Sequence, residues 1–303
     1  MANDHVICIE RMAKLSIDTK RLVIKFENEE PKYVAVCDIA CVILATAAIT
    51  LSGAVISSLG EEGAVIISVD KSYLPIALTL PANGNFFGAK RPHQQAMLIE
   101  SPEKIKLWNS VIASKIIQQA KVIEKYSPEI YKKLIYLAKK THADNDDNYE
   151  GFAAKIYWEN FFRFTDSQVK MRIQEGAEDL INSCLNYGYA ILRSVVARAL
   201  AGHGFCLNFG LGHCRKDNGF NLADDFIEPF RAIAERATLN IAEKYRNDKE
   251  LTSQIKRDLI NFILSQTVLL NRKNYRLFQA VDTVVQSYGQ VLDGKRKTLV
   301  LPA

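Results

Sequence analysis

Short apolar runs of strand length occupy the first 80 positions of the chain. "KLSID" (14–18) and "RLVIKF" (21–26) flank a gap of two residues, which is the spacing of a β-hairpin. "YVAVCDIACVILA" (33–45) and "GAVIISVD" (63–70) add runs rich in β-branched residues, and a helix is expected between them at 51–61. The pattern predicts a small β-rich domain that carries one helix.

Beyond residue 95 the apolar positions recur at i, i+3, i+4 and i+7, which is the period of an amphipathic helix. The segment 175–201 is apolar on several faces, so we expect it to be a central buried helix. Pro229 lacks a backbone donor, so the helix there either starts late or kinks. The segments that read as helical are 104–126, 127–140, 150–162, 175–201, 228–245 and 250–270.

A turn-rich segment separates the two patterns. Residues 81–95, "PANGNFFGAKRPHQQ", contain two prolines, an Asn-Gly pair and Gly88, which mark turns and a linker. We therefore predict an α+β chain of two domains. A small β-rich N-terminal domain spans residues 1–88, and a larger all-α domain spans residues 89–303.

One uncharged run is long enough to cross a membrane. "ACVILATAAITLSGAVISSLG" covers residues 40–60. Its β-branched start and its possible helix cap at Thr50 or Ser52 favour a buried strand, a turn and a short helix instead. The six cysteines are scattered, and the N-terminus lacks the pattern of a secretory signal. We therefore expect a cytoplasmic protein with free thiols.

The charge of the chain permits a polyanionic partner without requiring one. Thirty-nine basic and 34 acidic residues give a net charge of +5. The local pattern is more informative, because basic residues gather near aromatic ones at 132–140 and 271–276, and "GKRK" follows at 294–297. These clusters are candidate contacts to a phosphate backbone.

A histidine followed by several acids stands out in "LGHCRKDNGFNLADDFIEPFR", residues 211–231. Either Asp224 or Asp225 lies three or four positions before Glu228, so two carboxylates can share a helix face. A purely structural interpretation is that these acids stabilise a helix N-terminus. His213 completes a second interpretation, in which one imidazole and two carboxylates hold a divalent ion.

Glu150 supports the metal hypothesis from a distant part of the chain. It begins a predicted helix beside Ala153 and Ala154, whose small side chains allow close approach of a ligand. A set of one nitrogen and two carboxylate ligands suits Mg²⁺ or Mn²⁺ and leaves positions open for water and a phosphate oxygen. Such an ion would polarise a phosphodiester.

Zinc is the competing metal. His203, Cys206, His213 and Cys214 supply four possible ligands within twelve residues. Their spacing fits no common zinc pattern, and adjacent residues rarely face one ion together. We therefore favour the hard-metal interpretation over a structural zinc site.

Two other stretches resemble known binding motifs but do not match their templates. "DNDDN" at 144–148 resembles a calcium loop, but Tyr149 stands where glycine is needed and Lys155 where glutamate is needed. The "GLG" at 210–212 is no dinucleotide fingerprint, because Arg215 replaces the third glycine.

Four stretches together resemble one known family over essentially the whole chain. The chain is similar to the CRISPR-associated integrase family, Cas-one, and more narrowly to its type II branch. The stretches are "GAVIISVDKSYLPIALTLPANG" (63–84), "EGFAAKIYWENFF" (150–162), "LNYGYAILRSVVARAL" (185–200) and "GLGHCRKDNGFNLADDFIEPFR" (210–231).

This resemblance implies a Mg²⁺ or Mn²⁺ site made by Glu150, His213 and Glu228, with Asp225 as a further ligand or an orienter. Some branches of the family carry aspartate at the position of Glu228. Asn186, Tyr187 and Arg231 also match family positions. For these three we expect helix packing and a salt bridge.

The implied reaction joins the 3′-hydroxyl of captured foreign DNA to a CRISPR repeat by transesterification. The implied partners are DNA, a second copy of the chain paired through the β-rich domain, the small subunit Cas-two and the type II effector nuclease. The alternative is a non-catalytic nucleic-acid-binding scaffold subunit whose acids only cap helices.

Overall fold

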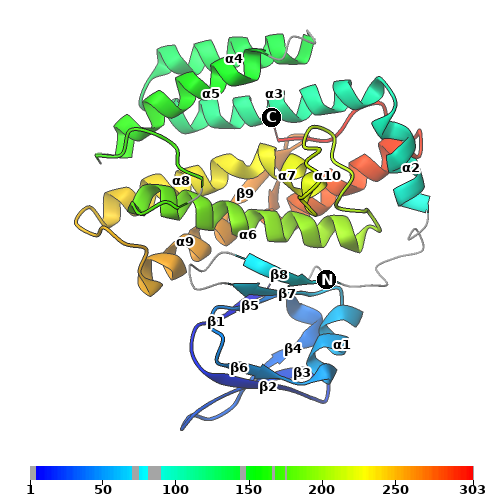
Figure 1. Ribbon diagram of the computed structural model, residues 1–303, viewed down its shortest axis with the longest axis vertical. Coiled ribbons are helices and arrows are strands. Elements are labelled where there is room, and N and C mark those ends of the chain that lie inside the picture. Colours follow the sequence, from blue (N-terminus) through cyan, green and yellow to red (C-terminus); the bar gives the residue numbers. More distant parts are fainter. Residues whose placement is uncertain are drawn as a thin grey trace. The chain divides into compact units, whose positions relative to one another are not determined.

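The computed structural model describes residues 5–69, 75–80, 90–143, 148–165, 168–174 and 176–302. The chain forms two compact units, one from residues 1–92 with 194–206 and the other from 93–193 with 207–303 (Figure 1). The domain boundary predicted after residue 88 lies outside the described residues, as do residues 144–147 of the candidate calcium loop.

The first unit contains a four-stranded sheet in the order β1-β5-β7-β8. Strand β5 (Ile39–Leu44) pairs in parallel with β1 (His5–Ile9) and β7 (Val65–Val69), and β7 pairs antiparallel with β8 (Pro75–Thr79). The sequence of β5, IACVIL, is apolar throughout and almost wholly buried. Such a continuous run is typical of a central strand that is covered on both faces.

A second four-stranded sheet has the order β4-β3-β2-β6. Strands β2 (Ala13–Asp18) and β3 (Arg21–Phe26) form the predicted hairpin, and β4 (Lys32–Ala35) and β6 (Ile49–Leu51) flank it. The two residues of the turn, Thr19 and Lys20, have φ angles of 47° and 63°. Positive φ at both positions defines the tight turn whose twist matches paired strands.

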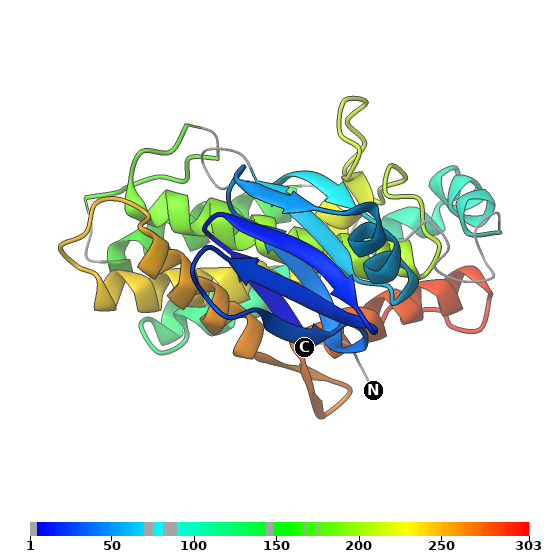
Figure 2. The same ribbon diagram turned by 90° about the horizontal axis from the view of Figure 1, so that it is seen from below.

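A core of aliphatic side chains joins these sheets to helix α1 (Gly53–Glu61), which Figures 1 and 2 show beside the strands. Val55 and Leu59 of α1 are fully buried in it. The uncharged run 40–60 therefore forms strand β5, strand β6 and this helix, as expected. Within the described residues, the chain has no helix with the length and hydropathy of a membrane span. A short 3₁₀ turn, Val36–Asp38, precedes β5.

Helices make up most of the second unit, which begins within α2 (Lys90–Ile99). The long helix α3 (Glu103–Ile123) packs against α4 (Pro128–Ala143) and α5 (Asn148–Phe161), and the three lie side by side in Figure 1. A 3₁₀ turn, Phe162–Thr165, ends α5. Burial along α3 recurs at helical spacing, as the sequence predicted.

Helix α6 (Leu180–Gly202) is the predicted central helix, and most of its side chains are buried. It begins five residues later than the apolar pattern indicated. A Cβ atom at Gly188 would lie 2.8 Å from the Cβ of Ala234, closer than real side chains approach. Glycine at this position therefore lets α6 lie directly against helix α8 (Arg231–Lys244).

Pro229 interrupts the acidic segment. Helix α7 (Asn221–Ile227) ends before it, and a 3₁₀ turn, Glu228–Phe230, connects α7 to α8. The prediction of a late start or a kink is therefore confirmed. The break changes the direction in which successive side chains point, which matters for the acids on either side of it.

The prediction of an all-α second domain is wrong between residues 267 and 276. Helix α9 (Ser253–Ser265) ends early, and strands β9 (Thr267–Leu270) and β10 (Lys273–Arg276) form a hairpin, drawn in orange in Figure 2, before α10 (Leu277–Leu292). "TVLL" alternates exposed and buried positions, which is the pattern of a half-buried strand. Asn271 and Arg272 supply the two positive φ angles that the turn requires.

Candidate active site

Two of the three predicted metal ligands converge on one lysine. Glu150 lies in the first turn of α5, Glu228 begins the 3₁₀ turn after α7, and Lys115 reaches both from α3. The ammonium Nζ lies 2.9 Å from Oε1 of Glu150 and 2.8 Å from Oε2 of Glu228. Helices far apart in sequence thus bring the two carboxylates to a common cation.

Glu228 is held as a buried anion. Only 4% of its side chain is exposed, and Nε of Arg231 donates to its Oε1 at 2.9 Å. Burial acts to raise the pKa of Glu228, but Arg231 and Lys115 outweigh it and lower the pKa to about 2. Its Oε2 is shielded from solvent and makes no aligned hydrogen bond, although the charge of Lys115 lies close to it.

Asp225 organises the loop that carries His213. Its fully buried carboxylate accepts backbone N–H groups from Leu211, from Gly212 at 3.2 Å and from His213 at 2.9 Å. Nδ1 of His213 lies 2.7 Å from its Oδ1. These four contacts use the four acceptor directions of the carboxylate. Of the two predicted roles, the geometry therefore corresponds to an orienter and leaves no lone pair for a metal.

His213 is oriented from both sides. Because a carboxylate only accepts hydrogen bonds, Nδ1 of His213 donates to Asp225, and in the neutral ring Nε2 then carries the lone pair. The ring of Trp108 meets the imidazole edge to face, with centroids 5.7 Å apart. The hydrogen bond with Asp225 raises the pKa of His213 against the effect of burial, and the charge of Glu228 acts in the same direction as the hydrogen bond.

The two glycines of "GLG" make this loop possible. A Cβ atom at Gly212 would overlap the indole of Trp108, and one at Gly210 would overlap the carbonyl oxygen of His213. The motif therefore closes the chain tightly around Asp225. This gives the glycines a structural role in place of the dinucleotide role that the sequence excluded.

Carboxylate and imidazole groups are ligands that divalent cations accept, but Lys115 pairs with the carboxylates of both Glu150 and Glu228. Among the described residues, no three His, Cys, Asp or Glu side chains are grouped to bind a metal ion. Yet Glu150 and Glu228 already share a cation, the ammonium of Lys115, and no described residue accepts or donates a hydrogen bond at Nε2 of His213. In this structure the ammonium of Lys115 therefore occupies the position between two of the three predicted ligands.

The residues expected to play supporting roles do so. Arg231 forms the predicted salt bridge with Glu228, and its guanidinium also lies 4.5 Å from the ring centroid of Tyr189. Tyr187 is buried, and Asn186 bonds to Arg172. Tyr187 thus packs in the core and Arg231 forms an ion pair, whereas Asn186 accepts a hydrogen bond from Arg172.

Lys115 is the site residue that sequence reasoning missed. The available signal was a single cation within the otherwise apolar stretch "VIASKIIQQA" of α3, where only 15% of the lysine side chain is exposed. A lysine buried to that degree needs anionic partners. The sequence gave no indication of which acids these would be, because they lie 35 and more than 100 residues away.

Comparison with known sequences identifies the family. Residues 6–269 match the family described as CRISPR associated protein Cas1. A CRISPR-associated endonuclease Cas1 from Neisseria meningitidis serogroup C (strain 8013) is 32% identical over 300 residues, covering 98% of this chain and 95% of that protein. A second, from Francisella tularensis subsp. novicida (strain U112), is 24% identical and covers 90% of this chain and 91% of that protein.

Solved structures share the fold at lower identity. A Cas1 protein from Thermotoga maritima has a TM-score of 0.81 at 13% identity, with 99% of each chain covered. A casposase bound to integration product has a TM-score of 0.80 at 20% identity, covering 97% of this chain and 92% of that one. With a family match over most of its length and a relative at 32% identity, this chain belongs to the CRISPR-associated Cas1 family.

Proposed function

We propose that the protein is a divalent-metal-dependent DNA integrase and endonuclease of CRISPR adaptation. In the proposed reaction, the 3′-hydroxyl of captured DNA attacks a phosphodiester of the CRISPR repeat, and the repeat oxygen leaves as a new 3′-hydroxyl. The family and its relatives named as endonucleases support this assignment, as does a fold shared with a casposase. The observation that carries it is the convergence of Glu150 and Glu228 on one cation.

Glu150, Glu228 and Nε2 of His213 are the proposed holders of Mg²⁺ or Mn²⁺. When bound, the ion supplies positive charge that polarises the phosphorus centre and stabilises the attacking or leaving oxygen. Asp225 keeps the imidazole of His213 in the tautomer that presents Nε2, and Arg231 keeps Glu228 ionised. These residues order the site before DNA arrives, which is the main contribution of protein groups to phosphoryl transfer.

The proposed partners follow from the same assignment. Beyond DNA, they are a second copy of the chain, the Cas2 small subunit and a type II effector nuclease. A similar fold occurs in a chain of a Cas6-RT-Cas1–Cas2 complex, with a TM-score of 0.78, 16% identity and 98% of this chain covered, although only 36% of that chain is matched. For the second copy we favour the β-rich unit, where Ile76 of the edge strand β8 is 67% exposed.

Half-site integration tests the proposal. Purified protein, its small partner and a repeat-containing DNA are incubated with Mn²⁺, with Mg²⁺ or with chelator, and joined products are separated by electrophoresis. We expect joining only with metal. Glu150→Ala, His213→Ala and Glu228→Ala should each abolish joining while DNA binding persists. Joining that survives in all three variants would refute the metal site.

The alternative is a DNA-binding scaffold without catalysis. One observation favours it: Lys115 and Arg231 already neutralise Glu150 and Glu228, so the acids have a structural partner without any metal. A scaffold would bind DNA equally well with chelator and would join no strands under any condition. The integration experiment therefore separates the two functions directly.

A further inference from the structure

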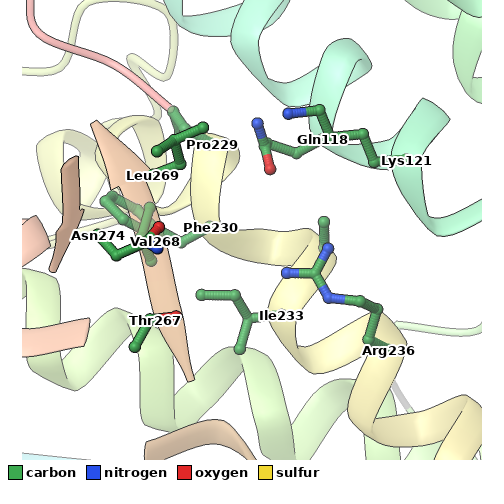
Figure 3. A pocket seen from close by; sticks show the side chains of 11 residues that line it. Gln118, Lys121, Pro229, Phe230, Ile233, Arg236, Thr267, Val268, Leu269 and Asn274 are labelled. Atoms are coloured by element: carbon green, nitrogen blue, oxygen red, sulfur yellow. The ribbon is translucent and has the colours of Figure 1, made fainter. Parts of the chain in front are cut away.

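A cationic cavity lies next to the candidate active site. It has a volume of about 160 Å³ and opens between α3, α8 and the β9–β10 hairpin (Figure 3). Gln118 and Lys121 line it from α3, Arg236 lines it from α8, and Asn274 lines it from β10. Among the described residues around it, two are cationic and none is acidic. A cavity of this composition attracts an anion.

Arg236 is the strongest sign of a missing ligand. Its half-buried guanidinium makes no hydrogen bond or ion pair with any described residue, although it carries five N–H donors. Glu235 is the adjacent acid and its charge acts on Arg236, but its oxygens accept hydrogen bonds from Tyr157 at 2.5 Å, from Tyr189 at 2.8 Å and from Gln119 at 3.1 Å. The donors of Arg236 are therefore available to a ligand in the cavity.

Lys121 brings a second positive charge to the same space. Burial and the charge of Arg236 both lower the pKa of Lys121, and burial lowers the pKa of Arg236. Two like charges that share a partly desolvated cavity repel each other. An anion bound between them would attract both cations. Figure 3 shows the side chains of Gln118, Lys121 and Arg236 extending toward the space between their helices.

The two segments that carry Lys115 and Glu228 continue into the walls of the cavity. Pro229, which lines it, is bonded to Glu228, and Gln118 lies one helical turn beyond Lys115 on α3. Lys121 lies six residues beyond Lys115, a rise of roughly 9 Å along the helix. Six residues also turn the helix by about 600°, so Lys121 points roughly 120° away from Lys115 and the cavity lies to the side of the two carboxylates.

We propose that this cavity is a phosphate subsite, in which Arg236 and Lys121 bind a backbone phosphate of the DNA strand near the phosphate at Glu150 and Glu228. The identity of the strand rests on the proposed function. The planar fork of an arginine pairs with two oxygens of a phosphate, and the lysine adds a point charge. Such contacts set the register of a strand without reading its sequence.

Four variants of the full chain test this inference. Arg236→Gln removes the fork. Asn274→Asp places a negative charge at the cavity from the exposed hairpin, where the fold tolerates it, and Asn274→Lys places a positive one. Asn271→Asp is the control, because it makes the same change at the turn of the same hairpin and outside the cavity. Thermal unfolding checks that each variant is folded.

The probe is a short fluorescent single-stranded DNA, titrated at several salt concentrations. Arg236→Gln and Asn274→Asp should each weaken binding roughly five- to tenfold, and Arg236→Gln should reduce the salt slope by about 1. Asn274→Lys should strengthen binding, and Asn271→Asp should leave it unchanged. If Arg236→Gln and Asn274→Asp both bind the DNA with the affinity and salt dependence of the wild type, the cavity is not a phosphate subsite.

A second arm identifies the source of the phosphate. Uncharged methylphosphonates are placed at successive positions of the probe, and one position should weaken binding to the wild type but not to Arg236→Gln. If inorganic phosphate competes at the cavity while no methylphosphonate has an effect, the cavity takes a free anion and the assignment to a strand is wrong. These binding experiments test the subsite and do not measure strand joining. If strand joining persists in the Glu150, His213 and Glu228 variants, the proposed function is refuted and the subsite is not.

Discussion

At the scale of single residues, Lys115 gives the site its charge balance. Two carboxylates near one another repel unless a cation lies between them, and here the protein supplies that cation from its own chain. A divalent ion entering the site meets an ammonium group of the same sign. Metal binding and withdrawal of Lys115 are therefore expected to be coupled.

Replacing Lys115 by methionine should make the protein depend on metal for stability. Without its cation, Glu228 keeps only Arg231, and we expect a loss of about 1–3 kcal/mol in chelator. Mn²⁺ should recover the lost stability. It should therefore raise the melting temperature of Lys115→Met by more than it raises that of the wild type. Differential scanning calorimetry measures both. Lys106→Met, at an exposed position of α3, is the matched control, and an equal Mn²⁺ effect in all three proteins would contradict the coupling.

Asp225→Asn should disorder the loop at His213. An amide has one acceptor oxygen, so at least one of the backbone N–H groups now bonded to the carboxylate would face another donor. We expect a loss of about 2–3 kcal/mol in unfolding free energy, together with lost strand joining.

The neighbouring Asp224→Asn is the control for that change. Asp224 lies 3.5 Å from Arg193 and is more exposed, so its loss should cost less than about 1 kcal/mol. Denaturant unfolding compares the two variants. Equal destabilisation by both would mean that the loop does not depend on Asp225.

At the scale of elements, one buried carboxylate connects four helices. Glu235 of α8 accepts from Gln119 of α3, Tyr157 of α5 and Tyr189 of α6. Burial raises the pKa of both tyrosines well above 10, and the charge of Glu235 adds to this effect. The raised pKa means that the fold prefers the protonated phenols. Their contribution to stability is complete below the ordinary tyrosine pKa and is lost as pH rises through and beyond it.

Tyr157→Phe should therefore reduce the steepness of alkaline unfolding. The variant loses a buried hydrogen bond, which should cost about 1–3 kcal/mol at neutral pH. It also has one fewer phenol to deprotonate, so its stability should fall less steeply above pH ~10. Denaturant unfolding at a series of pH values measures both effects. Tyr136→Phe, at an exposed position of α4, is the control, and identical alkaline slopes would contradict the prediction.

The elements show where sequence reasoning succeeds and where it stops. The hairpin at 14–26 and the helix at 175–201 were predictable because local spacing and burial agree there. The hairpin at 267–276 was missed because the apolar pattern of α9 runs on into "TVLL", and its turn, Asn271–Arg272, lacks the glycine of common hairpin turns. Asp225 was ambiguous because spacing along a helix does not show which neighbour each acid faces.

At the scale of the whole molecule, association is the property most open to test. If two copies of the chain pair through the β-rich unit, as proposed, pairing would cover Ile76 of the edge strand β8, and Ile76→Lys should weaken the association. Met12→Lys, which adds the same charge at an exposed loop position, should leave the equilibrium unchanged. Sedimentation velocity over a concentration series distinguishes them. A dimer of unchanged strength in Ile76→Lys would place the interface elsewhere.

The break at Pro229 has a consequence for how this segment tolerates change. Asp225 orders the loop of His213, Glu228 and Arg231 pair with each other, and Glu235 accepts from three other helices. The 3₁₀ turn between α7 and α8 sets the directions of these side chains. One residue inserted between them would rotate the side chains after it by about 100° around the helix axis relative to those before it. A single insertion here should therefore break several contacts at once, since it would misdirect the carboxylate of Glu228, the guanidinium of Arg231 and the tyrosine-bound Glu235 together.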